Sequence, residues 1–346
     1  MKSATQLSGG AGRQVDVRNS TIHTGRPALY GVLLILLGFC GYTGLVVFSA
    51  LRHLFPGDPL QIWLRSAIWY TGAPVFSGLV LFAFDLLVLA PGNRRQTTVP
   101  FDEPAEKSLT VVLTAYNDEA SIPLAVRDFQ SHPLVRRVIV VDNNSKDRTT
   151  QAAREAGAET IIEKRAGYGR CVYRALSEAL QFTDTPLTLL CEGDMTFRAY
   201  DIDKFMAYIV HAEIVNGTRI VEQLRERDTQ LTTFMYYGNF FVGKLLEVKH
   251  LGLGTFTDVG TTYKLCRNSA LARLLPLLSP SVNLEFNAHF LDVALTNGIR
   301  IVECPITFHQ RVGLSKGGNT SNIRALRVGM RMMTGLLISW KYLMRE

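Results

Sequence analysis

Two acidic residues follow an uncharged run in the segment LTLLCEGDMTF, which spans residues 187–197. Glu192 and Asp194 lie two positions apart, so on an extended segment their side chains point the same way and can share one divalent cation. Mg²⁺ and Mn²⁺ prefer such oxygen ligands together with substrate phosphates, and a cation held there would neutralise charge on a leaving diphosphate. A salt bridge to an arginine is the alternative, because a buried carboxylate needs a positive partner.

A second polar cluster is VVDNNSKDRT, residues 140–149. Asp142 ends a β-branched run, and the residues after it are typical of a turn that leads into a helix. Turn and cap chemistry explains Ser145 and Asp147, since such side chains satisfy free backbone amides at helix starts. Asp142 is also placed to accept a hydrogen bond from a ribose or a base, so both interpretations stay open for it.

Two further segments combine glycines with cations. In EKRAGYGR, residues 163–170, Gly167 and Gly169 precede a helix-like stretch, and backbone amides and cations there could bind a diphosphate. An ordinary turn with a solvated basic face is the alternative. Arg311 belongs to the second segment, HQRVGLSKGG, in which cations and a hydroxyl suit a phosphate. The alternative for this segment is a basic loop that binds lipid head groups without specificity.

The elements that must position these clusters alternate between β-rich and helix-like runs. The expected strands are 109–115, 138–141, 160–162, 187–190 and 213–215, and the expected helices are 120–129, 148–156, 168–182 and 201–210. This order is typical of an α/β fold, a mostly parallel sheet with helices on both faces. Ligands of such sheets bind at the carboxyl ends of the strands, where the polar clusters are expected.

Two apolar runs precede this domain. Residues 28–50 contain no charged side chain, and residues 66–90 contain only Asp85. Each run exceeds the length of about 20 residues that crosses a bilayer, so we expect a transmembrane hairpin over 28–90. Lysines and arginines flank the hairpin more densely than its connecting loop, which predicts an integral membrane protein whose two termini and catalytic domain are cytoplasmic. Residues 1–27 form a polar leader, and 91–107 form a linker.

Two stretches are amphipathic, with basic ends. Residues 224–253 carry aromatic and apolar side chains at helical spacing, which predicts an interfacial helix that could guide a lipid tail, with a buried core helix as the alternative. Residues 319–346 have the same character and a shorter apolar core than either span, so we expect a helix on the membrane surface.

Composition excludes several other classes of protein. The net charge of +7 is spread along the chain without an aromatic-interleaved basic block, so we expect no nucleic-acid partner. The five cysteines form no CxxC pair, which argues for reduced thiols and against a zinc site or a disulfide framework.

With these clusters in this order, the chain resembles inverting family 2 glycosyltransferases of the GT-A fold. Within them it is most similar to polyprenyl-phosphate glycosyltransferases of the dolichol-phosphate mannose synthase type. The resemblance covers roughly Ser108 to Gly318 and rests on TAYNDEASI, VVDNNSKDRT, GYGR, EGD, NGTR, DVGTTYK and ECPITFHQRVGLSK. Families that make long polysaccharides usually carry a QxxRW motif, and this sequence has none.

The resemblance implies a set of site residues. The nucleotide-binding residues are Ala115, Tyr116, Asn117, Glu119, Asp142, Asp147, Gly167 and Gly169. The metal ligands are Glu192 and Asp194, the catalytic residues are Asp194, Asp258, Arg311 and Lys316, and the donor or phosphate contacts are Arg219 and Ser315. The chain departs from the family at three places: Asp118 is an extra acid, Glu192 replaces an aspartate, and Thr196 stands where glutamine is frequent.

The implied reaction moves a hexosyl group from a UDP- or GDP-hexose to a polyprenyl phosphate at the cytoplasmic face, with Mg²⁺ or Mn²⁺ as cofactor. The expected partners are the nucleotide sugar, the polyprenyl phosphate and membrane lipids. A phosphate acceptor is already anionic, so we expect catalysis by positioning and charge neutralisation. Two alternatives stay open: a family 2 enzyme with a glycolipid or polysaccharide acceptor, and a catalytically silent membrane scaffold.

Overall fold

The computed structural model describes residues 25–52, 61–90, 101–226, 229–251, 253–313 and 321–344. Its α-helices are α1 (Arg26–Arg52), α2 (Gln61–Tyr70), α3 (Gly72–Phe84), α4 (Ile122–Gln130), α5 (Thr149–Glu155), α6 (Tyr168–Ala179), α7 (Asp201–Tyr208), α8 (Thr233–Lys249), α9 (Asn268–Leu274), α10 (Phe286–Thr296) and α11 (Asn322–Leu337). Its strands are β1 (Leu109–Ala115), β2 (Val135–Asp142), β3 (Glu159–Ile162), β4 (Leu187–Glu192), β5 (Ile214–Thr218), β6 (Lys264–Arg267) and β7 (Ile301–Pro305).

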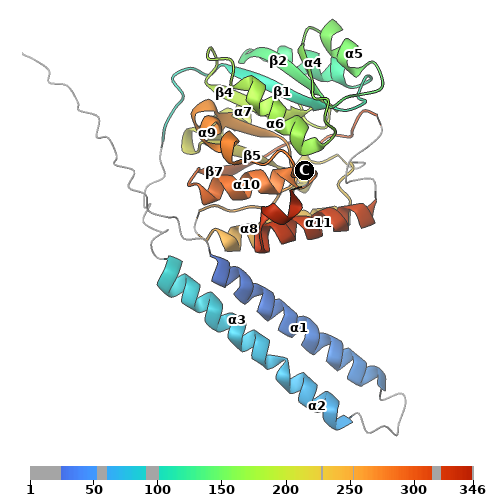
Figure 1. Ribbon diagram of the computed structural model, residues 1–346, viewed down its shortest axis with the longest axis vertical. Helices are drawn as coiled ribbons and strands as arrows, with labels where there is room; N and C mark the ends of the chain where they lie inside the picture. Colours follow the sequence, from blue (N-terminus) through green and yellow to red (C-terminus); the bar gives the residue numbers. More distant parts are fainter. Residues whose placement is uncertain are drawn as a thin grey trace, which may run out of the picture.

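The strands form one seven-stranded sheet in the order β3-β2-β1-β4-β6-β5-β7. Strand β6 pairs antiparallel with β4 and β5, and the other neighbours pair in parallel. Helices cover both faces of this sheet (Figure 1). The predicted α/β class, a mostly parallel sheet wound with helices, is therefore confirmed.

Strand β1 shows how the sequence produces two covered faces. All seven of its residues are buried, as expected of a central parallel strand. Leu109, Val111 and Leu113 pack in one core cluster with side chains of α4, α5 and α7. Val112 points the other way and packs in a second cluster with α6, α9 and α10. The alternation of side chains along the strand thus fixes helices to both faces.

The polar residues at the ends of β1, β2 and β4 lie at one edge of the sheet. Ala115, the last residue of β1, pairs with Asp142, and Thr114 pairs with Glu192 in β4. Because β2, β1 and β4 are adjacent and parallel, the loops that follow them leave the sheet together. The predicted convergence of these loops at the carboxyl ends of the strands is confirmed.

The two N-terminal apolar segments form a helical hairpin that extends away from the sheet domain (Figure 1). The segments Arg26–Leu51 and Trp63–Leu89 are long and apolar enough to cross a membrane, judged by length and composition. Their helices approach closely, since a Cβ on Gly31 would lie 2.6 Å from the carbonyl oxygen of Gly78. The lone acid of the second segment, Asp85, accepts a hydrogen bond of 2.7 Å from the backbone N–H of Ala28. That carboxylate therefore satisfies a free amide in the first turn of α1.

Helices α8 and α11 lie between the sheet domain and the hairpin (Figure 1). The Tyr30 hydroxyl of α1 donates to the carbonyl oxygen of Leu337, at the end of α11, over 2.7 Å. Helix α8 is shorter than the predicted 224–253 because it begins at a cap, where the Thr232 hydroxyl accepts from the Met235 N–H. Helix α11 ends before a short 3-10 turn in which Trp340 is buried, so the chain packs back onto the domain there.

Candidate active site

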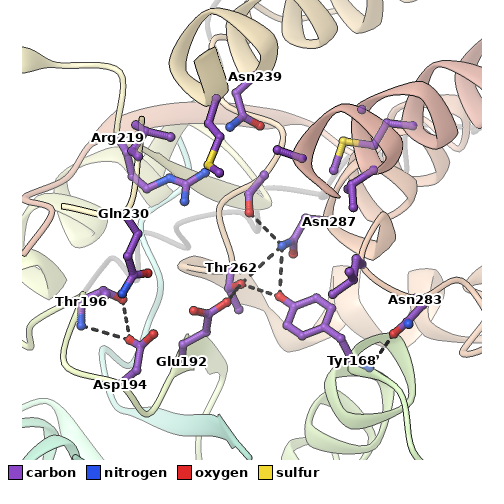
Figure 2. Close-up of a pocket in the computed structure, with 18 of the residues that line it drawn as sticks. Tyr168, Glu192, Asp194, Thr196, Arg219, Gln230, Asn239, Thr262, Asn283 and Asn287 are labelled. Atoms are coloured by element: carbon purple, nitrogen blue, oxygen red, sulfur yellow. Dashed lines mark hydrogen bonds between the residues drawn. The ribbon is translucent and has the colours of Figure 1, made fainter. Parts of the chain in front are cut away.

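A cavity of about 1060 Å³ opens at the carboxyl edge of the sheet. One part of its wall is polar and includes Asp118, Glu192 and Asp194. Another part is apolar and is formed by α8 and α11. Figure 2 shows the polar part, where side chains from β4, from the loop before β6 and from α6 and α10 converge. The cavity therefore has a charged region that is continuous with an apolar one.

Asp194 lies at the centre of the charged region and is 1% exposed. Its Oδ1 accepts a hydrogen bond from the backbone N–H of Thr196 over 3.0 Å and another from the Thr196 hydroxyl. Its Oδ2 is buried and lacks a hydrogen-bond partner among the described residues. That oxygen is 3.0 Å from Nη1 of Arg311, so only an ion pair balances its charge.

Arg311 bridges two carboxylates. Its Nη1 faces Asp194, and its Nη2 donates to Oδ1 of Asp118 over 2.8 Å. Burial alone would lower the pKa of Arg311, but Asp194 and Asp118 outweigh that effect and raise it. Two backbone hydrogen bonds hold this loop in place, from the His309 N–H to the oxygen of Thr196 and from the Val312 N–H to the oxygen of Asp194.

Glu192 ends a series of hydrogen-bonded side chains (Figure 2). Its Oε1 accepts from the Thr262 hydroxyl over 2.7 Å. Since the proton of Thr262 is used there, the hydroxyl of Tyr168 donates to Thr262, and Asn287 in turn donates to Tyr168. Burial, and next the charge of Asp194, raise the pKa of Glu192 to about 7. A divalent cation would remove this penalty, because it favours the ionised form of both carboxylates.

Arg219 is held by Asp258 in a buried pair. Nε and Nη2 of Arg219 donate to the two carboxylate oxygens over 2.7 and 2.9 Å. Burial would raise the pKa of Asp258, but Arg219 outweighs it and the pKa is lowered. Arg219 lines the cavity beside Asn239 of α8 (Figure 2), whereas Asp258 is fully buried behind it. Asp258 thus orients Arg219 and does not itself face the cavity.

The loops after β1 and β2 are tied to each other. The Oδ1 of Asn117 accepts from the Lys146 N–H over 2.7 Å, and the Oε2 of Glu119 accepts from the Arg148 N–H over 2.9 Å. Asp142 accepts from the backbone N–H and the hydroxyl of Ser145. These side chains build the loops and do not line the cavity.

Asp147 has the same kind of partners. Its Oδ1 accepts from the Thr149 N–H over 3.0 Å and its Oδ2 from the Glu119 N–H over 3.3 Å. The carboxylate of Asp142 also accepts from the Thr150 hydroxyl. Turn and cap chemistry, one of the two interpretations open from the sequence, therefore accounts for the contacts of both acids.

The two glycines of GYG have different physical roles. Gly167 has a φ of 140°, a conformation that other residues rarely adopt, and it lines the cavity at the start of α6. Its N–H donates to Oδ1 of Asn143 over 2.9 Å. Gly169 permits close packing, since a Cβ there would lie 1.7 Å from the carbonyl oxygen of Val282. Of the two, only Gly167 is among the cavity-lining residues.

The apolar part of the cavity consists mainly of large flexible or aromatic side chains. Those that are also exposed include Phe234, Tyr237, Phe241, Leu326 and Met330. The surfaces of soluble proteins seldom expose so many apolar side chains in one patch, so this wall is suited to contact with an apolar partner. Its helices contact α1 of the apolar hairpin, which places the wall beside the candidate spans.

The structure brings together part of the predicted site. Seven predicted residues line the cavity: Ala115, Tyr116, Gly167, Glu192, Asp194, Arg219 and Arg311. Six lie outside its lining: Asn117, Glu119, Asp142, Asp147, Gly169 and Asp258. Ser315 and Lys316 fall outside the described residues.

Sequence reasoning missed several lining residues, above all Asp118, Tyr168, Thr262 and Asn287. Asp118 had a signal, since it is an extra acid in TAYNDEAS. Tyr168 and Thr262 lie within the motifs GYGR and DVGTTYK, but only their neighbours were predicted to be site residues, and Asn287 lies outside every motif.

The residues present suit a divalent cation that arrives with an anionic ligand. Among the described residues, no three His, Cys, Asp or Glu side chains form a ready metal-binding group. Glu192 and Asp194 supply carboxylate oxygens, and Oδ2 of Asp194 is buried without a hydrogen bond. Mg²⁺ and Mn²⁺ commonly use one or two carboxylates and complete their shells with water and substrate phosphates. The donor set therefore fits such a cation as part of a metal–diphosphate complex.

Comparison with known proteins relates most of this domain to a known family. Residues 110–275 match the family model described as Glycosyl transferase family 2. The match includes β1 to β6, with Glu192 at the end of β4, and the loops that carry Asp118, Asp194, Arg219 and Asp258. Together with the observed sheet, it confirms the predicted GT-A fold class.

Several relatives carry glycosyltransferase names. An uncharacterized glycosyltransferase of Mycobacterium tuberculosis is 34% identical over 116 residues, which are 33% of this chain and 50% of the relative. The chain thus spans about half the length of that relative. A dolichyl-phosphate hexose transferase of Haloferax volcanii is 27% identical over 209 residues, 60% of this chain and 86% of the relative.

Among solved structures, the chain is similar to glucosyl-3-phosphoglycerate synthase of Mycobacterium tuberculosis, in complex with Mn²⁺, UDP and glucosyl-3-phosphoglycerate. The TM-score is 0.47 at 15% identity, with 69% of this chain and 88% of that one covered. The family match and the named relatives agree on one point: residues 110–275 are similar to glycosyl transferase family 2.

Proposed function

We propose that the protein is a membrane-bound inverting glycosyltransferase that moves a hexosyl group from a UDP- or GDP-hexose to a polyprenyl phosphate. The observation that carries this proposal is the cavity, in which a charged region around Asp194 continues into an apolar wall formed by α8 and α11. A nucleotide sugar matches the first region, and a long isoprenoid chain matches the second. The name of the Haloferax volcanii relative supports the same acceptor class.

The charged region supports catalysis by positioning. Glu192 and Asp194 would hold Mg²⁺ or Mn²⁺, which when bound neutralises charge on the diphosphate leaving group. Arg219 and Arg311 present guanidinium groups to the same space. No histidine lines the cavity among the described residues, and Asp258 is occupied by Arg219. A phosphate oxygen of the acceptor needs no base, because it is anionic at neutral pH.

The membrane location belongs to the same proposal. The two candidate spans would anchor the chain, with both termini and the catalytic domain in the cytoplasm. Helices α8 and α11 would then lie at the bilayer surface, with their exposed aromatic and methionine side chains toward the lipid. An acceptor could enter the cavity laterally without leaving the bilayer.

The test incubates the purified protein with Mn²⁺ or Mg²⁺, a polyprenyl phosphate and a panel of UDP- and GDP-sugars, and follows the lipid by mass spectrometry. We expect a glycosyl-phosphoryl-polyprenol that disappears with EDTA. Asp194→Asn should lower its formation about 100-fold or more, since the metal loses a charged ligand. Asp184→Asn, an exposed acid paired with Arg137 far from the cavity lining, is the control. Donor binding or hydrolysis without lipid product would refute the acceptor, and binding of no donor would refute the enzyme.

A further inference from the structure

Asp118 has contacts that set it apart from its neighbours. Its side chain is 7% exposed and lines the cavity, whereas the adjacent Glu119 does not line it. The Asp118 carboxylate uses both oxygens: Oδ2 accepts from the Tyr116 N–H over 3.0 Å, and Oδ1 accepts from Nη2 of Arg311 over 2.8 Å. The first bond fixes the carboxylate to its own loop, and the second reaches a residue 193 positions away.

Arg311 lies between two carboxylates, of which only one, Asp194, is a candidate metal ligand. One nitrogen faces Asp118 and the other faces Asp194, the carboxylate that suits a divalent cation. A cation at Asp194 repels a guanidinium at the same oxygen, so that half of the bridge must give way when the metal binds. An arginine paired with Asp194 alone would then have no carboxylate to fix its guanidinium in the cavity. Asp118 supplies the hold that does not depend on Asp194.

We propose that Asp118 is a positioning residue that keeps Arg311 in the cavity while a divalent cation takes Asp194. The Nη1 group of Arg311, released from Asp194, then turns to the diphosphate that arrives with the cation. A guanidinium recognises phosphate oxygens well, because its N–H groups form a planar fork. This inference rests on the proposed function for the identity of the donor, but the exchange of Arg311 for a cation does not depend on the acceptor.

The experiment measures Mn²⁺ binding by electron paramagnetic resonance on the full-length protein without nucleotide or acceptor, so that only the competition between Arg311 and the cation at Asp194 is measured. Arg311→Gln should strengthen Mn²⁺ binding about tenfold, because it removes the competing cation from Asp194. Asp118→Asn should weaken it, since Arg311 then pairs with Asp194 alone. In the Arg311→Gln background, Asp118→Asn should cause no further change. Asp128→Asn, which breaks another aspartate–arginine pair outside the cavity lining, should bind Mn²⁺ like the wild type.

Two results would overturn the proposal. A further loss of Mn²⁺ affinity in the double variant would make Asp118 a direct metal ligand, and unchanged affinity in Arg311→Gln would show that no exchange occurs. Asp118→Glu keeps the charge and should recover part of the Mn²⁺ affinity that Asp118→Asn loses. If Asp118→Asn does not fold, Asp118→Glu takes its place and should bind Mn²⁺ more weakly than the wild type. Where wild-type transfer is detected, Asp118→Asn should lower kcat/KM for the donor about 100-fold. Absent transfer with normal Mn²⁺ exchange would refute the proposed acceptor and leave this inference standing.

Discussion

Asp292 holds three donors in a buried cluster that supports the apolar wall of the cavity. It accepts from Nζ of Lys249 over 2.8 Å, from Nε2 of His250 over 2.7 Å and from Nε1 of Trp340 over 2.6 Å. The side chains of Lys249 and Asp292 are 5% and 4% exposed. Burial would raise the pKa of Asp292, but the His250 hydrogen bond and the charge of Lys249 outweigh it, so the pKa is lowered.

The substitution Asp292→Asn keeps the shape of the side chain and removes its charge. The ammonium of Lys249 then faces a neutral amide in a buried site, and breaking such a pair costs about 3 to 5 kcal/mol. For a protein of this size, that corresponds to a fall in melting temperature of about 10 °C. The assay is thermal unfolding in detergent followed by tryptophan fluorescence, to which Trp340 contributes.

Two variants make this result specific. Asp184→Asn removes a carboxylate that is 38% exposed and paired with Arg137, so it should change stability by at most about 0.5 kcal/mol. Lys249→Met combined with Asp292→Asn should cost less than the sum of the single changes, because no charge is left unpaired. A melting temperature of Asp292→Asn within about 2 °C of the wild type would refute the reasoning.

Two more predictions concern stability. Gly169→Ala should lower the free energy of unfolding by about 3 kcal/mol or more, since its Cβ would lie 1.7 Å from the backbone of Val282. Gly44→Ala is the control, because a Cβ there meets nothing within 4 Å and should change stability little. Urea unfolding compares the two variants. Burial lowers the pKa of His289 to about 4, so the unfolded state binds the proton more readily and stability should fall as the pH drops from about 6.5 toward about 4. The ring nitrogen Nε2 accepts from the Ser279 N–H, which protonation would oppose. The stability advantage of wild type over His289→Gln should therefore shrink by about 2 kcal/mol between pH 7.5 and pH 5, and a constant difference would contradict this.

Local pattern was enough to predict much of the fold. The expected strand 109–115 has the observed bounds of β1, because a seven-residue run of mostly apolar and β-branched side chains is typical of a buried strand. Helices α4 to α7 lie within or near the expected ranges, since each has buried side chains at helical spacing. Strand β6 was not predicted, because its sequence KLCR is short and charged. Lys264 is nevertheless buried there, and its ammonium donates to the carbonyl oxygen of Thr261 and to the side chain of Asn287.

The sequence by itself determined which loops meet, because parallel strands bring their carboxyl ends to one edge. It also determined that Glu192 and Asp194 lie there, since Glu192 ends a buried strand and Asp194 follows two residues later. The tertiary structure alone decided which neighbouring acids face the cavity. Asn117 has a φ of 51°, and past this turn Asp118 points to Arg311 while Glu119 bonds to the next loop. Pairings over such distances depend on how the strands and helices pack, and no spacing within the chain encodes them.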